Sequence, residues 1–484
     1  MTLRGRAATR RPISLRAREP AAKRLPDKEG RRSGEGDSGE APSPPGQLLD
    51  VADLTVSIPT ESGTIEAVRG ISLAIESGET VGIVGESGSG KTMLALSLLG
   101  LLPAAAQVTG SVLLDGEELL GSSERQWRAV RGDRIAMVFQ DPMTALNPMY
   151  QVGWQVAESV RLHRKAPRGE AWARAVALLS AVGLPEPDQV AHRYPHELSG
   201  GMRQRVVIAM AIANEPELLI ADEPTTALDV TVQAQILDLL KTIKAETGAA
   251  MILISHDLGV VAGVADRVLV MYAGKAVEVG SVDDVFAGPR MPYTAGLLAS
   301  LPSLDRRKER LASIRGTPPS GIGYGPGCAF APRCPMAADV CGEQPPLLNV
   351  GIGHEAACHF AANESAAGEP LTASAPDTDS ARKGERDAPA GQAGSDIVLT
   401  VRNLTKHFRV RGTGFRDFST VQAVSGVDLE LRAGRCLALV GESGCGKSTL
   451  ARLLLRLEEP TSGSIALNGQ ELTALSDDDM RPIR

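Results

Sequence analysis

One twelve-residue stretch occurs twice in this chain, and this repeat constrains the fold more than any other feature of the sequence. Residues 81–92 read VGIVGESGSGKT, and residues 437–448 read LALVGESGCGKS, 356 positions later. The same offset relates Ala67 to Ala423, so the similarity extends upstream of the repeated stretch. A fixed offset between similar segments indicates that one structural unit has been duplicated. The sequence therefore predicts two copies of one domain.

The chain has 484 residues, which is room for about three domains. We expect five segments: a disordered basic tail at 1–47, the first copy at 48–290, a cysteine-bearing extension at 291–360, a disordered linker at 361–396 and the second copy at 397–484. The linker has almost no branched apolar residues, so it cannot bury enough surface to offset the entropy of ordering. Translation of an upstream stretch from a misplaced start codon is the alternative for the tail.

The second copy is shorter than the first. It comprises 88 residues, and the counterpart of Gln140 would stand at position 493, beyond Arg484. We expect the sequence to be a piece of a longer protein, because half of such a domain would expose apolar strands and an unpaired sheet edge. A naturally shortened product is the alternative.

Composition excludes several classes of protein. Apolar residues make up 43% and charged residues 23%, which is typical of a folded protein and excludes a wholly disordered one. The net charge of −7 gives no support for a nucleic-acid partner. The longest apolar stretch, 93–106, is shorter than the roughly 20 residues that a bilayer requires. We therefore expect no membrane-spanning segment, so that any role at a membrane is peripheral.

The repeated stretch contains a phosphate-binding motif. Residues 85–92 fit G-x-x-x-x-G-K-[ST] between an apolar strand at 80–84 and a helical run at 93–102. Such glycines let backbone N–H groups surround phosphate oxygens at a helix N-terminus. Lys91 is expected to reach the β- and γ-phosphates and Thr92 to bind Mg²⁺; a glycine-rich turn without ligand is the alternative. The predicted phosphate-binding residues are Gly85, Glu86, Ser87, Gly88, Ser89, Gly90, Lys91 and Thr92 in the first copy, and Gly441, Glu442, Ser443, Gly444, Cys445, Gly446, Lys447, Ser448 and Thr449 in the second.

Two acidic residues end an apolar strand at 218–223. A carboxylate at the end of a buried strand is costly unless it meets a cation. Asp222 suits a Mg²⁺ shell, and Glu223 suits a base that polarises the attacking water. The alternative is a pair of acids at a solvated strand end.

A second glycine-containing helix start lies at 198–202, with Ser199 as the expected N-cap. The residues of this signature segment are Leu198, Ser199, Gly200, Gly201 and Met202. Two glycines here let the backbone approach a phosphate, as in the first motif. Both helix ends can hold one nucleotide only if they belong to different domains, which predicts a nucleotide held between two domains.

The ordered set of motifs resembles the nucleotide-binding domains of ABC transporters. The set consists of the P-loop, Phe139-Gln140, the LSGGM segment, Asp222-Glu223, Ala227-Leu228-Asp229 and Ser255-His256-Asp257. The resemblance covers residues 48–302 and resumes from 397. It implies an α/β P-loop NTPase with a RecA-like core, an antiparallel β subdomain and a helical signature subdomain, followed by a second partial copy.

The resemblance also implies roles for single residues. Gln140 would contact Mg²⁺ and the attacking water and relay to the permease, Asp229 would bridge a dimer, and His256 would hold the γ-phosphate. With Glu223 these are the implied catalytic residues, and Thr92, Gln140 and Asp222 are the implied Mg²⁺ ligands. Outside such a set, a lone histidine or glutamine is more often structural.

Longer strings resemble the oligopeptide/dipeptide (and nickel) importer subfamily. These are residues 193–205, residues 221–235, and Arg290-Met291-Pro292-Tyr293-Thr294, in which Met291 replaces the usual histidine. The resemblance implies an ATPase (ATP + H₂O to ADP + phosphate) that energises solute uptake from the cytoplasmic side of the inner membrane. Implied partners are membrane permease subunits, indirectly an extracytoplasmic solute-binding protein, and a second nucleotide-binding domain, without nucleic acid. A soluble ABC ATPase acting in DNA repair or translation is the alternative.

Four of the six cysteines lie close together in the extension: Cys328, Cys334, Cys341 and Cys358. Six cysteines are too few for a disulfide scaffold in a chain of this length. Four thiolates in a loop-rich segment suggest a metal, and the open spacing suits a [4Fe–4S] cluster better than paired zinc ligands. The resemblance implies such a cluster as well. Zinc, with His354 and His359 as further ligands, and four unliganded thiols are the alternatives.

Overall fold

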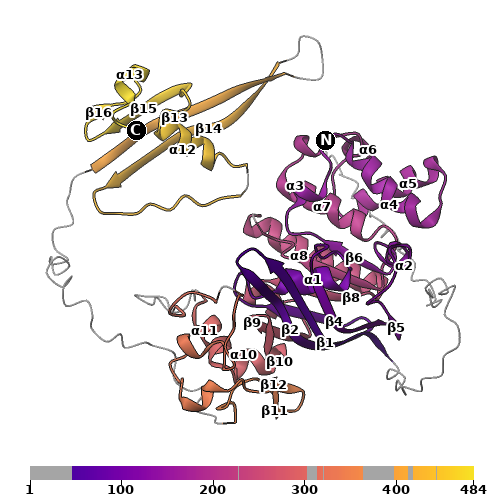
Figure 1. Cartoon of the computed structure of the whole chain (residues 1–484). Helices are drawn as coiled ribbons and strands as arrows, with labels where there is room; N and C mark the ends of the chain where they lie inside the picture. The colour runs from indigo at the N-terminus through magenta and orange to yellow at the C-terminus, as the bar shows by residue number, and fades with distance from the viewer. Residues whose placement is uncertain are drawn as a thin grey trace, which may run out of the picture. The chain divides into compact units, whose positions relative to one another are not determined.

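The computed structural model of the chain describes residues 46–226, 228–301, 313–319, 321–362, 397–411, 418–442 and 444–484. They form two compact units, one of nearly all of 46–362 and one of 397–484 (Figure 1). Apart from a few residues at their ends, the expected tail at 1–47 and linker at 361–396 lie outside the described residues, as does Ser443 of the second P-loop.

A mixed sheet of eight strands is the centre of the first unit, in the order β11-β12-β10-β9-β3-β8-β7-β6. Its parallel strands are β3 (Thr80–Val84), β6 (Ile135–Val138), β7 (Leu218–Asp222), β8 (Ala250–Ser255) and β9 (Arg267–Tyr272). The first four are buried at every residue and are nearly continuous apolar runs, as expected for parallel strands covered on both faces. Crossover helices α8 (Val230–Thr247) and α9 (Leu258–Ala262) follow β7 and β8.

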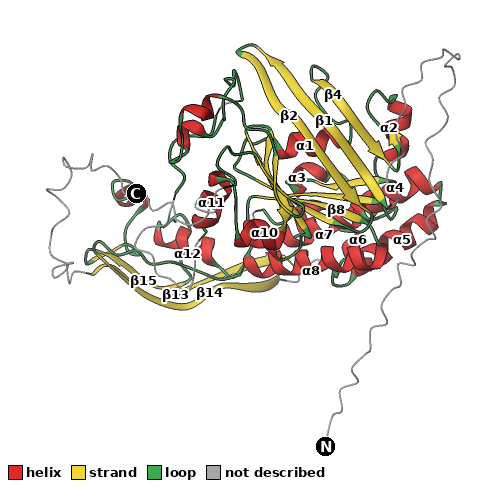
Figure 2. Ribbon diagram, turned by 90° about the horizontal axis from the view of Figure 1, so that it is seen from below, coloured by secondary structure: helices red, strands yellow, loops and turns green. Residues whose placement is uncertain are grey.

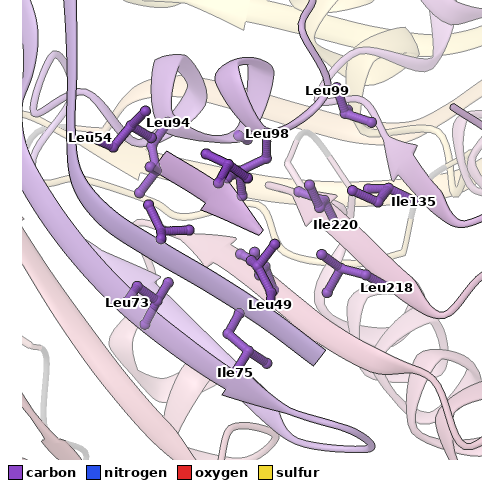
Figure 3. Close-up of a cluster of buried hydrophobic side chains, with 14 of the residues drawn as sticks. Leu49, Leu54, Leu73, Ile75, Leu94, Leu98, Leu99, Ile135, Leu218 and Ile220 are labelled. Carbon is purple, nitrogen blue, oxygen red and sulfur yellow. The ribbon is translucent and has the colours of Figure 1, made fainter. Parts of the chain in front are cut away.

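Alternate residues of the parallel strands enter two different hydrophobic cores. Leu218 and Ile220 of β7 pack against an antiparallel sheet and α1 (Lys91–Leu98), and Leu94 and Leu98 of α1 complete this core (Figure 3). The antiparallel sheet has the order β2-β1-β4-β5 and consists of β1 (Gln47–Thr60), β2 (Gly63–Glu76), β4 (Gln107–Leu114) and β5 (Glu117–Glu118). Figure 2 shows β1, β2 and β4 side by side, on the opposite side of this unit from α8. The P-loop helix therefore lies between two sheets.

The opposite faces of the same strands pack against helices. Leu219 and Ala221 of β7 join a core that includes Val156, Leu178 and Val206. The helices between β6 and β7 are α3 (Pro142–Ala145), α4 (Val152–Arg164), α5 (Arg168–Ala181), α6 (Pro187–Ala191), the 3₁₀ helix η1 (Pro195–Glu197) and α7 (Gly200–Ala211); α2 (Glu124–Val130) precedes β6. In the described residues no helix is both long and apolar enough to cross a bilayer. The predicted core, antiparallel β subdomain and helical subdomain are confirmed.

The cysteine-bearing extension continues the central sheet. Its elements are α11 (Pro292–Ala299), η2 (Ala331–Arg333), η3 (Asp339–Gly342), β11 (Leu348–Gly351) and β12 (His354–Ala356); β10 (Lys275–Ser281) and α10 (Val282–Ala287) precede them. Strand β12 pairs with β10 in antiparallel orientation. Glu278 of β10 is fully buried and accepts hydrogen bonds from the backbone N–H groups of Arg290 (2.5 Å) and Met291 (3.2 Å), with His354 Nε2 2.9 Å away. A buried carboxylate thus ties β12 to the start of α11.

The second unit repeats the antiparallel sheet and the P-loop helix. Its elements are β13 (Ile397–Arg411), β14 (Phe418–Arg432), α12 (Lys447–Leu454), β15 (Ser462–Leu467), β16 (Gln470–Glu471) and α13 (Asp477–Met480). The sheet order, β14-β13-β15-β16, matches that of the first unit. However, Leu437, Leu439 and Val440, which correspond to β3, are exposed and form no strand. In the first unit β8 and β9 hold β3 on either side, and the described part of 397–484 contains no such neighbours.

Replacing Arg134 by methionine is expected to lower the free energy of unfolding by about 3 kcal/mol. The Arg134 side chain is 3% exposed and lies 2.8 Å from Glu117 and 3.0 Å from Glu217, so its removal takes away a buried cation that both carboxylates contact. Urea unfolding would measure the change. Arg128→Met is the control, because Arg128 is 78% exposed beside Glu124 and should change stability by less than about 1 kcal/mol. Equal losses in the two variants would contradict this account.

Candidate active site

The first P-loop joins β3 to α1 in a conformation that requires glycine. Gly90 has φ 102°, and a Cβ atom there would lie 2.1 Å from the Ala67 carbonyl oxygen of β2. Lys91 is 6% exposed, and its Nζ donates to the carbonyl oxygens of Gly85 (2.8 Å) and Glu86 (2.9 Å). Burial lowers the pKa of Lys91, against the opposing effect of the nearby carboxylates. Because neutral carbonyls hold this ammonium, an anionic phosphate oxygen is a stronger partner for it.

The second P-loop adopts the same backbone conformation in its described residues. Gly446 has φ 97°, and a Cβ there would lie 2.2 Å from the carbonyl oxygen of Ala423, the counterpart of Ala67. Lys447 Nζ donates to the carbonyl oxygens of Gly441 and Glu442, both at 2.6 Å. The sequence repeat is therefore also a repeat of loop geometry and of lysine placement.

Asp222 and Thr92 fit a divalent cation. Asp222 is 2% exposed at the end of β7, and its Oδ1 has no hydrogen-bond partner. Burial raises the pKa of this carboxyl group, and the charge of Glu223 raises it further, against a hydrogen bond from Thr92 and the charge of Lys91. A buried carboxylate oxygen without a donor, beside a hydroxyl group and a phosphate-binding loop, suits Mg²⁺, which prefers oxygen ligands.

Glu223 is the centre of a hydrogen-bonded cluster formed at the carboxyl ends of three neighbouring strands. Its Oε2 accepts hydrogen bonds from Gln140 Nε2, after β6, and from Thr226 Oγ1, both at 2.8 Å. His256 Nδ1, after β8, lies 3.2 Å from Oε1. Burial works against ionisation of Glu223, but the hydrogen bonds from Thr226, His256 and Gln140 outweigh it and hold the pKa below the usual value. The cluster thus presents an ionised, oriented carboxylate.

Glu223 also has a strained backbone. Its φ of 46° lies in the left-handed region, which costs about 1–3 kcal/mol for a residue other than glycine. Such strain is common at functional sites.

Thr226 is a hydrogen-bond partner of Glu223 that was not predicted from the sequence. The only sequence signal for it was its place in the Pro-Thr-Thr run directly after the acidic pair.

The signature segment forms a capped helix start. Ser199 is the N-cap of α7, and its Oγ accepts a hydrogen bond from the Met202 N–H at 3.3 Å. Leu198 is buried, and Ser199 and Gly200 are exposed. A Cβ at Gly201 would lie 2.7 Å from the Val232 side chain of α8. Asp229 is half-buried just before α8. Pairing of this helix start with a P-loop of another domain stays a prediction.

The four clustered cysteines are half-buried and form no disulfide. Burial, with a smaller contribution from the neighbouring thiols of Cys358, Cys328 and Cys341, raises the pKa of Cys334 to about 11. In the described residues no group of three or more His, Cys, Asp or Glu side chains is arranged to hold a metal ion. Of the two histidines considered as zinc ligands, His354 pairs with Glu278, and His359 Nε2 lies 3.0 Å from the Glu343 carbonyl oxygen. The expected iron–sulfur cluster or zinc site therefore finds no support in this geometry.

Alkylation of Cys334 is expected to be slow at pH 8 and to accelerate about tenfold per pH unit towards pH 11, because only the thiolate reacts. A pKa raised to about 11 leaves about one thiolate in a thousand at pH 8. Exposed Cys436 is the internal comparison and should be labelled first. Iodoacetamide labelling followed by peptide mass spectrometry measures both rates. Labelling of Cys334 as early as Cys436 at pH 8 would refute the burial of this thiol.

The sequence matches two known families. The family described as "ABC transporter" matches residues 68–226 and again residues 424–484. The family described as "Oligopeptide/dipeptide transporter, C-terminal region" matches residues 277–341. The first family thus occurs twice, in agreement with the internal repeat, and the second includes three of the four clustered cysteines.

Individual relatives are similar over long stretches. The oligopeptide transport ATP-binding protein OppD of Mycobacterium bovis is 50% identical over 445 residues, which cover 90% of this chain and 71% of the relative. OppD of Salmonella typhimurium is 49% identical over 319 residues, 66% of this chain and 95% of the relative. The dipeptide transport ATP-binding protein DppD of Bacillus subtilis is 52% identical over 297 residues, 61% of this chain and 89% of the relative. The chain therefore belongs to the ABC transporter ATP-binding proteins, in the oligopeptide/dipeptide transporter family.

Proposed function

We propose that this chain hydrolyses ATP to ADP and phosphate and thereby energises the import of peptides through a membrane permease. The observation that carries the proposal is the Glu223 carboxylate, which Gln140, Thr226 and His256 orient beside the buried Asp222. Relatives named for oligopeptide and dipeptide transport support the substrate class. A soluble ABC ATPase acting on nucleic acid is not favoured, since the similar extension belongs to a transporter family.

Each residue of the site has a separate role in the proposed hydrolysis of ATP. The Lys91 ammonium and P-loop N–H groups such as those of Gly88, Gly90 and Thr92 would bind the phosphates. Thr92, Asp222 and Gln140 would hold Mg²⁺. Bound Mg²⁺ neutralises charge that develops on the phosphoryl oxygens. Glu223 accepts a hydrogen bond from the attacking water and orients it, and His256 donates to the γ-phosphate. The hydrogen bonds that hold Glu223 would then be exchanged for bonds to water and phosphate.

The signature segment acts on a second nucleotide-binding domain. Ser199 and Gly200 are exposed at the start of α7, where N–H groups and the helix dipole favour an anion. We place this helix end against the γ-phosphate bound by another domain, with Asp229 bridging the pair. ATP then stabilises the closed pair because it binds that form more tightly than the open one.

The permease docks on exposed apolar side chains that follow Gln140. Met143, Met149, Tyr150 and Trp154 are 51%, 77%, 47% and 41% exposed, and the Tyr150 and Trp154 rings stack at 4.6 Å. A cluster of exposed large apolar side chains is typical of an interaction site. This docking places the chain peripherally at the cytoplasmic face of the membrane, with the extracytoplasmic solute-binding protein as an indirect partner.

Co-expression with the permease subunits tests the proposal. We expect detergent extracts to contain the chain together with the permease, with ATPase activity that peptide-loaded binding protein stimulates. Met149→Asp should reduce this stimulation at least about fivefold, since it places a charge in an apolar contact. Ile352→Asp is the control, because Ile352 is fully exposed in the extension. Purification with nucleic acid and without permease would refute the proposal.

The iron–sulfur cluster and its zinc alternative stay predictions from cysteine spacing and resemblance. Iron, sulfide and zinc contents of anaerobically purified protein would test them. No step of the proposed reaction depends on either metal.

A further inference from the structure

The cysteine-bearing extension contacts the first P-loop through an ion pair between a buried arginine and a half-buried glutamate. Arg333, the residue before Cys334, has a side chain that is 5% exposed. Its Nη1 and Nη2 donate to the two carboxylate oxygens of Glu86 at 2.6 and 2.9 Å. Glu86 is the second residue of the P-loop. Such a bidentate, charge-assisted pair is strong and directional, so the extension restrains this side chain.

A second contact restrains the backbone of the same residue. The Glu86 N–H donates to the hydroxyl oxygen of Tyr293 at 2.8 Å. Tyr293 is fully buried in the first turn of α11, where its ring lies 4.5 Å from that of Tyr272 and 5.4 Å from that of Phe330. Arg333 Nη1 also donates to the Tyr272 hydroxyl at 3.2 Å. The main chain and the side chain of Glu86 are therefore both held by residues outside the P-loop.

The charge of Glu86 explains why this restraint matters for nucleotide binding. Its carboxylate is one of three that act on the Lys91 ammonium, with Glu223 and Asp222. Without a cation partner it would attract Lys91 and repel an incoming triphosphate. Arg333 neutralises the carboxylate and keeps it turned towards the extension.

We propose that the extension is part of the nucleotide site, with Arg333 and Tyr293 as positioning residues that hold Glu86 so that Lys91 and the loop N–H groups stay available to phosphate. This rests on the proposed function, because it requires that the first P-loop binds ATP. It adds a role for a segment whose two contact residues lie 207 and 247 positions after Glu86 in sequence.

The test compares Arg333 variants of the full chain with and without Glu86→Gln, with MgATP affinity measured by displacement of a fluorescent ATP analogue. All variants carry Lys447→Ala, so that the second P-loop does not contribute, and Glu223→Gln, so that ATP is not consumed. Arg333→Met is expected to raise the Kd for MgATP about tenfold, as for loss of a charge-assisted contact. Adding Glu86→Gln to Arg333→Met should restore the Kd for MgATP to within about threefold of the parent's value, because it removes the uncompensated carboxylate charge. Arg333→Lys should be intermediate, since lysine keeps the charge but not the bidentate geometry.

Arg134→Met is the matched control. Arg134 is equally buried and pairs with carboxylates at Glu117 and Glu217. The Arg134→Met variant should be less stable than the parent, and its Kd for MgATP should stay within about twofold of the parent's value. Should Arg333→Met fail to fold, Tyr293→Phe, which removes only the hydroxyl group, is expected to raise the Kd about threefold.

The outcomes separate this inference from the proposed function. An unchanged Kd in both Arg333→Met and Tyr293→Phe would overturn the inference. So would a raised Kd in Arg333→Met that Glu86→Gln does not restore, because Arg333 would then act through packing of the extension. If the parent that carries Lys447→Ala and Glu223→Gln itself failed to bind MgATP, the proposed function would fail first.

Discussion

Glu223→Gln is expected to lower kcat for ATP hydrolysis at least about 100-fold while the Kd for MgATP stays within about threefold. Glutamine keeps the size of the side chain and an acceptor oxygen, so Thr226 and Gln140 retain a partner. It lacks the negative charge that orients and polarises the attacking water. Phosphate release measured at saturating ATP, beside equilibrium binding of a fluorescent analogue, separates the two quantities.

Glu79→Gln is the matched control for this variant. Glu79 is another half-buried carboxylate, 3.0 Å from Arg267, but it stands at the amino-terminal end of β3, opposite the P-loop. Its kcat should equal that of the parent within about twofold. A Glu223→Gln variant that keeps more than a tenth of the parent's kcat would exclude Glu223 as the residue that activates water.

Lys91→Ala is expected to weaken MgATP binding at the first P-loop about 100-fold. The Lys91 ammonium is the cation held inside the loop by the carbonyl oxygens of Gly85 and Glu86, and alanine leaves the β- and γ-phosphates without it. The effect is measured in the Lys447→Ala background, because the second P-loop places an equivalent lysine in the same way.

Lys447→Ala alone is the control and should keep the ATP affinity and turnover of the first P-loop. If the double variant turned over ATP as fast as Lys447→Ala, nucleotide would be bound elsewhere and the assignment of the site would be wrong.

Much of the site could be predicted from local sequence. Gly90 follows a buried strand and precedes a helix, and its positive φ is a requirement that few residues other than glycine meet. Ser199 precedes two glycines and an apolar helix, and it caps that helix. Asp222 ends a continuous apolar run, which becomes the buried strand β7. In each case the residues that decide the conformation are neighbours in the chain.

The contacts of Glu86 show what local sequence could not decide. Tyr293 and Arg333 lie 207 and 247 positions after Glu86, and nothing in their own patterns points to the P-loop. The cysteines are a similar case, since their spacing suggested metal ligands but the described side chains are not arranged to hold a metal. Distances between remote side chains depend on how helices and strands pack, and residue spacing does not encode that packing.

A comparison of the two P-loops shows most clearly what local sequence determines and what tertiary structure determines. The sequence alone determined that both loops share one conformation, with glycines at the same positive φ and a lysine on the same carbonyl oxygens, because these bonds form within a few residues. Only the tertiary structure decided that the strand before the first loop is buried between β8 and β9 while residues 436–440 are not a strand. A strand requires hydrogen-bonding neighbours from elsewhere in the chain, and a short motif cannot supply them.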